Sequence, residues 1–186
     1  MTGGAPSCTP TGAGSGCGTP ICAALPLAIR LALGSLFIIS GLMKLDLVGL
    51  SWVHSSLVAM EPRDFAFSIR AFKLGLSDPL VQFLTFAIPW TELLCGLALL
   101  LGLLTRGAAA LIALLMLAFI AGIASLLARG LDVNCPCFGA LKLFCTGPLG
   151  ACHIVRNLGF AAAAGLLLWL GPGPASLDRI LDRRPA

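Results

Sequence analysis

The sequence has few charged residues. They make up 11% of the 186 positions, against about 25% in an ordinary soluble domain. Hydrophobic residues make up 58%, and the mean hydropathy is +0.99. A soluble fold of this length needs far more polar surface to cover its core. The composition therefore excludes a soluble domain and predicts a membrane protein, with lipid as its first partner.

Other absences remove further classes of function. The formal net charge of +4 is spread thinly, without a dense basic run, so we expect no binding to nucleic acid. Tyrosine is absent and there are three tryptophans, too few to form complete aromatic belts at the two membrane interfaces. The chain has no haem-attachment motif, no phosphate-binding loop and no candidate serine–histidine–aspartate triad.

Four apolar stretches have about the length needed to cross a bilayer, which is ~20 residues for a ~30 Å hydrocarbon core. They cover residues 25–43, 79–104, 107–128 and 149–170. Each is expected to be a helix, because a helix pairs its own backbone groups in lipid. The predicted fold is an all-α membrane protein, a bundle of four transmembrane helices.

The chain divides into three predicted parts. Residues 1–20 carry no charge and are rich in small residues and proline, which is typical of a disordered tail. This segment lacks the basic start of a signal peptide, so we interpret the first span as an uncleaved helix. Residues 21–172 form the transmembrane domain, and residues 173–186 form a short basic tail.

The polar link between the first two spans contains a helical pattern. Its apolar and basic side chains fall on opposite faces: Phe65, Ile69 and Phe72 on one, and Arg63, Arg70 and Lys73 on the other. This pattern predicts an amphipathic helix in the membrane interface. The alternative is a solvated loop. The next link, between the second and third spans, is predicted to be a tight turn at Thr105 and Arg106.

Small residues recur at four-residue spacing in every predicted span, which lets neighbouring helices approach closely. The pairs are Ala28 with Ala32, Ala98 with Gly102, Ala118 with Gly122, and Gly159 with Ala163. They support a bundle without specifying its contacts.

Four of the eight cysteines lie within 18 consecutive positions: Cys135, Cys137, Cys145 and Cys152. In Cys135-Pro136-Cys137 two thiols one residue apart can close a small, strained and easily reduced disulfide. Such a pair suits the transfer of oxidising equivalents. Two thiolates also bind soft metals such as Cu(I) or Zn(II), and the remaining alternative is a pair of ordinary loop cysteines. Cys145 or Cys152 can act as a resolving thiol, or the two can bridge each other.

Three ionisable residues lie within the apolar stretches: Arg30, Glu92 and Arg156. Each costs about 2.5–3.5 kcal/mol to insert, so they mark a functional site by default. Glu92 falls near the middle of its span, and the two arginines flank that level from opposite sides. We therefore expect an Arg–Glu–Arg cluster, with Asn157 beside Arg156. Its functional interpretation is a site for a quinone head group or a proton path, and its structural interpretation is an ion pair that fixes helix register.

Several runs resemble a known family. They extend over residues 67–111, 129–139 and 155–157, and their most specific parts are Pro89-Trp90-Thr91-Glu92, Cys135-x-Cys137-Phe138-Gly139 and Arg156-Asn157. They resemble the methylamine-utilisation protein MauE family, within the DoxX-like group of four-helix membrane proteins. The likeness covers about residues 25–170.

The resemblance implies a multi-pass protein of the bacterial cytoplasmic (inner) membrane that supplies or matures disulfides in exported redox proteins. A periplasmic thioredoxin-like protein or an exported client would be its partner, and a quinone is a candidate cofactor. Cys135 and Cys137 would be the redox pair, while Arg30, Glu92 and Arg156 would form the polar site. Cys145, Cys152 and the N-terminal cysteines depart from the family pattern.

The leading hypothesis is an integral membrane thiol–disulfide oxidoreductase, or an accessory factor for disulfide formation. A soft-metal binder or transporter and a non-catalytic assembly factor are the alternatives. Four spans place both termini on one side, and a disulfide-forming pair needs an oxidising compartment. We therefore place the cysteine loop outside the cytoplasm, although four Lys and Arg residues would then lie inside and six outside, which the positive-inside rule disfavours.

Overall fold

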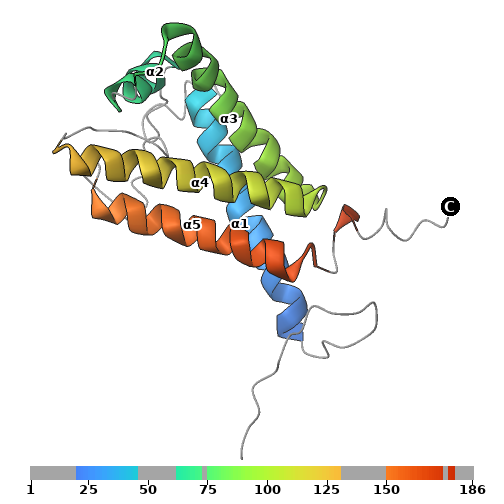
Figure 1. Ribbon diagram of the computed structural model, residues 1–186. Helices are drawn as coiled ribbons and strands as arrows, with labels where there is room; N and C mark the ends of the chain where they lie inside the picture. Colours follow the sequence, from blue (N-terminus) through green and yellow to red (C-terminus); the bar gives the residue numbers. More distant parts are fainter. Residues whose placement is uncertain (1–19, 46–61, 73–74, 131–149, 174–175, 179–186) are drawn as a thin grey trace, which may run out of the picture.

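The computed structural model describes residues 20–45, 62–72, 75–130, 150–173 and 176–178. Its helices are α1 (Pro20–Leu45), α2 (Pro62–Ala71), α3 (Asp78–Leu101), α4 (Thr105–Ala128) and α5 (Ala151–Leu170) (Figure 1). The predicted N-terminal tail lies outside the described residues except for Pro20, which begins α1.

Four of these helices are long and apolar enough to cross a membrane: most of α1, and α3, α4 and α5. The predicted fold class is therefore confirmed. Large apolar side chains such as Phe83, Leu114 and Val155 point outward and are about two-thirds exposed. In a bilayer these surfaces face lipid.

Helices α1 and α3 form a tightly packed antiparallel pair, held together at glycines. A Cβ atom added to Gly34 would lie 2.9 Å from the Gly96 carbonyl oxygen, and one added to Gly96 would lie 2.8 Å from that of Gly34. A Cβ added to Gly41 would lie equally close to the Pro89 carbonyl oxygen, at 2.8 Å. The closest approach of α1 and α3 thus occurs at glycines that are not in the predicted four-residue pairs. Gly159, which is in one of those pairs, makes no close approach, because an added Cβ there would meet nothing within 4 Å.

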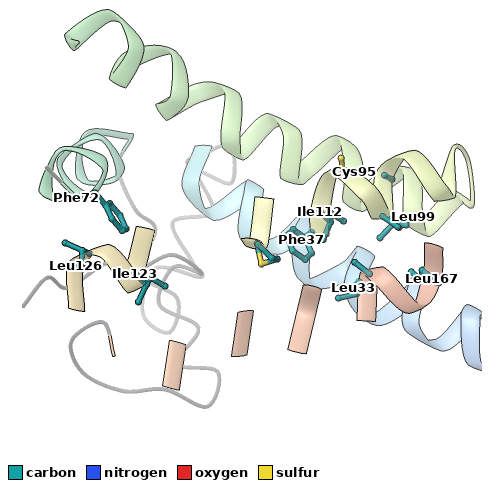
Figure 2. Close-up of a cluster of buried hydrophobic side chains, with 13 residues drawn as sticks. Leu33, Phe37, Phe72, Cys95, Leu99, Ile112, Ile123, Leu126 and Leu167 are labelled. Carbon is teal, nitrogen blue, oxygen red and sulfur yellow. The ribbon is translucent and has the colours of Figure 1, made fainter. Parts of the chain in front are cut away.

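Helices α4 and α5 lie side by side across the α1–α3 pair, and the main apolar core fills the space between the two pairs (Figure 1). Leu33, Leu99 and Leu167 meet at one end of this core (Figure 2). Near its middle, the rings of Phe37 and Phe160 pack edge to face, with centroids 6.4 Å apart. This is a favourable geometry for two aromatic rings.

The short helix α2 has the predicted amphipathic pattern. Phe65, Ile69 and Phe72 are buried, whereas Arg70 is exposed. The apolar face packs on the bundle: Phe65 and Ile69 contact Val81 of α3 and its neighbours. A Cβ added to Gly122 of α4 would lie 3.0 Å from the Phe72 ring. The apolar face of α2 therefore packs against the transmembrane helices α3 and α4.

The turn between α3 and α4 precedes the predicted one. It runs through Gly102, with φ 68°, to Leu104, with φ 49°, and Thr105 and Arg106 already belong to α4. The prediction missed this because Gly102 ends α3 in the left-handed conformation that glycine adopts easily. A side chain at Gly102 would also collide with the Arg30 guanidinium.

Candidate functional site

The Glu92 carboxylate lies in the interior of the bundle, on α3, and is paired with Lys44 near the end of α1. The Lys44 ammonium donates hydrogen bonds to both carboxylate oxygens, at 2.6 Å to Oε1 and 2.7 Å to Oε2. The Ser40 hydroxyl donates to Oε2 at 3.0 Å. Neither charged side chain has exposed surface. The three residues form what we call the Ser40–Lys44–Glu92 cluster.

Two aromatic rings enclose the ammonium group. Lys44 Nζ lies 5.5 Å from the ring centroid of Phe65 in α2 and 5.8 Å from that of Phe119 in α4. Both distances are within the range of a cation–π interaction. The cluster is therefore built by residues of α1 and α3 and covered by residues of α2 and α4.

The predicted Arg–Glu–Arg cluster is wrong. Among the described residues, the hydrogen-bond partners of Glu92 are Lys44 and Ser40, and neither arginine is one of them. Arg30 instead donates to the carbonyl oxygens of Leu99 (3.0 Å), Leu100 (3.4 Å) and Pro172 (2.7 Å). It binds the C-terminal end of α3.

Side-chain direction explains this correction. Each Cα–Cβ bond in a helix tilts toward the N-terminus of that helix. In the antiparallel α1–α3 pair, Lys44 and Glu92 therefore lean toward each other. Arg30 leans the other way, toward the start of α1 and the end of α3. The prediction compared only the depths of these residues and the reach of their side chains. It also assigned Lys44 to the polar link, although Ser40 and Lys44 share a helical face by their four-residue spacing.

Asn157 and His153 lie one turn apart on the buried face of α5. Asn157 is 0% exposed, and neither atom of its amide has a hydrogen-bond partner among the described residues. An unpaired buried amide costs about 1–3 kcal/mol. His153 Nδ1 accepts a long hydrogen bond from the Gly150 N–H, at 3.4 Å. Arg156, between them in sequence, is partly buried. Asn157 thus provides an unused donor and acceptor inside the bundle.

A family model described as methylamine utilisation protein MauE matches residues 22–170. This range covers all four membrane-spanning helices and most of the chain. The chain belongs to the MauE family. No curated protein and no solved structure matches it. The expected family is therefore confirmed, and it supports a membrane accessory protein of methylamine utilisation. With four helices able to cross a bilayer, this MauE protein is a multi-pass membrane protein.

Three of the four candidate redox cysteines of this MauE protein, Cys135, Cys137 and Cys145, lie outside the described residues. Cys152 is the second residue of α5, is exposed and is disulfide-bonded. Cys95 in α3 is a buried free thiol. The described part of the chain contains no group of three or more His, Cys, Asp or Glu residues that could hold a metal ion.

The cysteine-bearing segment connects two of the membrane-spanning helices. It leaves the C-terminal end of α4 and enters the N-terminal end of α5. Because successive spans run in opposite directions, this is also the end of the bundle at which α1 stops, immediately after Lys44. The segment with Cys135 and Cys137 is thus attached to the end of the bundle nearer the Ser40–Lys44–Glu92 cluster.

Proposed function

We propose that this MauE protein supports disulfide formation in an exported protein by thiol–disulfide exchange at Cys135 and Cys137. A client thiolate attacks the Cys135–Cys137 disulfide and forms a mixed disulfide. The second client thiol then displaces the remaining cysteine. The client gains a disulfide, and its two electrons remain on the reduced Cys135–Cys137 pair.

The observation that carries this proposal is the family match over residues 22–170, a range that contains Cys135-Pro136-Cys137 and the disulfide-bonded Cys152. A disulfide between Cys145 and Cys152 is suited to take up the two electrons of the reduced pair by a second thiol–disulfide exchange, in which that bond breaks and the Cys135–Cys137 bond re-forms. A periplasmic thioredoxin-like protein or the exported client itself is the proposed partner. The proposed location is the bacterial inner membrane, with the cysteine segment outside the cytoplasm.

The intramembrane polar site of this proposal is the Ser40–Lys44–Glu92 cluster, which replaces the expected set of Arg30, Glu92 and Arg156. A lysine ammonium can donate a hydrogen bond to the oxygen of a quinone head group, and a nearby carboxylate can carry a proton. A membrane quinone is the candidate acceptor for the two electrons. Two protons are then required at the quinone, and a buried Lys–Glu pair is chemically able to relay them.

The decisive experiment measures the redox state of Cys135 and Cys137 in the membrane. Cells are quenched with acid, free thiols are alkylated, and the peptide is analysed by mass spectrometry. We expect a disulfide that is reduced by an added dithiol and re-forms when the dithiol is removed. Replacing both residues, Cys135→Ser with Cys137→Ser, should abolish client oxidation, whereas the control Cys95→Ala, in the α3 interior, should retain it.

Two results would contradict thiol exchange. Thiols that stay reduced and react only after a chelator is added would indicate a soft-metal site. Full client maturation in the double serine variant would indicate an assembly factor without redox chemistry.

A further inference from the structure

Asn157 of α5 is a polar residue that the chemistry proposed above does not use. Its side chain is fully buried, and within the described ranges both its amide nitrogen and its amide oxygen are without a hydrogen-bond partner. Its neighbours on the same helix face, Ile154, Phe160 and Ala161, pack against the main apolar core. An unpaired amide is unfavourable in such surroundings, so its burial points to a ligand.

The contacts of α1 and α5 show which part of the interior Asn157 faces. Arg30 of α1 bonds to Pro172, just after α5, and Phe37 packs on Phe160. The two helices therefore run antiparallel. Asn157 lies three residues before Phe160, and Ser40 lies three residues after Phe37. Because the helices are antiparallel, Asn157 and Ser40 lie on the same side of the Phe37–Phe160 contact, each about one helical turn away from it. Both residues are on the core-facing sides of their helices.

The surroundings restrict the chemistry of the ligand. The Ser40–Lys44–Glu92 cluster, whose Ser40 lies on the same side of the ring contact as Asn157, is neutral as a unit, because its one positive and one negative charge bond to each other. A bound ion would need a further counter-charge in this apolar interior. An asparagine amide both donates and accepts, which suits a neutral group with an oxygen atom.

We propose that Asn157 forms part of an internal binding site for a small neutral oxygen-bearing group, either water or the carbonyl of a lipid-soluble compound. One N–H of its amide donates to the oxygen of the ligand, and its carbonyl oxygen accepts where the ligand has a hydrogen to give. Ser40 of α1 and Phe160 of α5 line this site. The site depends on no cysteine, so a failure of the thiol-exchange proposal leaves it unaffected.

The chain allows a direct test, because Asn134 and Asn157 are its only asparagines. Isotopic labelling of asparagine side chains therefore gives two amide signals in solid-state NMR of the full chain in lipid bilayers. An Asn134→Ser variant leaves the Asn157 signal alone. Polarisation transfer from water to this signal detects bound water. Titration with methyl nonyl ketone, an uncharged lipid-soluble carbonyl compound, detects carbonyl binding as a saturable chemical-shift change.

Either transfer from water or a saturable shift with the ketone is the expected result, and the two identify different sources of the oxygen. In the same preparation, Asn157→Leu should lower the unfolding temperature, because the bound group loses its partner. The proposal is overturned if water transfers no polarisation, the ketone causes no shift, and Asn157→Leu unfolds at a higher temperature than the parent protein. That last result is expected when leucine replaces an amide that binds nothing.

Discussion

Lys44 and Glu92 carry opposite charges in a part of the bundle where neither side chain has any exposed surface. Each charge alone would cost about 2.5–3.5 kcal/mol in the membrane. Their mutual hydrogen bonds and the Ser40 hydroxyl offset this cost without exposing either group to water. The pair is consequently sensitive to the loss of one partner and tolerant of the loss of both.

We predict that Lys44→Met and Glu92→Leu each lower the free energy of unfolding by about 3–5 kcal/mol, because each breaks the buried pair. The combined variant Lys44→Met with Glu92→Leu should lose far less than the sum, because no buried charge remains. Unfolding in lipid nanodiscs, analysed as a double-mutant cycle, measures the coupling. Ser35→Ala, whose hydroxyl is exposed and bonds only within α1, is the control and should change little. Additive effects of the two single variants would argue against the pair.

At this scale the sequence predicted that Glu92 is buried but not which residue neutralises it. The presence of a carboxyl within an apolar stretch was sufficient for the first inference. The second required the direction in which Arg30 and Lys44 leave α1, and that depends on the antiparallel register with α3. A count of residues along each span carries no such information.

At the scale of elements, α1 and α3 are packed so closely that backbone oxygens occupy the space where side chains would begin. A Cβ added to Gly34 would lie 2.9 Å from the Gly96 carbonyl oxygen, and a Cβ added to Gly96 would lie 2.8 Å from the Gly34 carbonyl oxygen. Backbone cannot move aside as a flexible side chain can. The distance between the two helices is therefore set by these glycines, and so is the position of Glu92 relative to Ser40 and Lys44.

We predict that Gly34→Ala or Gly96→Ala destabilises the bundle by roughly 1–3 kcal/mol through overpacking. The matched control is Gly159→Ala in α5, where a Cβ meets nothing within 4 Å. It should be neutral or should stabilise by up to about 1 kcal/mol, since alanine is the better helix former. Thermal unfolding of the three variants in one lipid composition makes the comparison. Equal effects at Gly34 and Gly159 would show that helix propensity, not packing, governs these positions.

The helices themselves were predictable, because a span of about 20 apolar residues and a period of 3.6 are local properties of the chain. The partner of each face was not. The pattern in α2 indicated one apolar side, but only the folded chain shows that Phe72 packs on Gly122 of α4. Repeated small residues were equally uninformative, because those facing lipid, such as Gly159, match the pattern as well as those at an interface.

For the whole molecule, the ends of three helices are joined by Arg30 and by residues that follow α5. Arg30 bonds to carbonyl oxygens at the end of α3 and to Pro172 beyond α5. The Asp178 carboxylate accepts from the backbone N–H groups of Leu104 (2.7 Å) and Thr105 (2.9 Å), at the start of α4. It thereby satisfies donors that a helix N-terminus otherwise leaves unpaired. The sequence placed Asp178 in a basic tail, because a contact made across the fold leaves no local pattern.

This arrangement predicts a pH dependence of stability. Burial alone would raise the pKa of Asp178, but hydrogen bonds from Thr105 and Leu104 and the charge of Arg30 outweigh it, so its pKa lies below the ordinary value of 3.8. The ionised carboxylate therefore stabilises the folded state above that value, and this contribution disappears as the pH falls through the lowered pKa.

Asp178→Asn should cost about 0.3–1 kcal/mol at neutral pH, the typical worth of a negative charge at a helix N-terminus, and the parent and variant stabilities should converge between about pH 4 and pH 2. Unfolding temperatures of both proteins, measured in the same detergent across this range, give the difference curve. Asp78→Asn is the matched control, because its ion pair with Arg70 is exposed and such pairs contribute little. A constant difference between parent and Asp178→Asn at every pH would show that the carboxylate charge does not hold the end of the chain to α4.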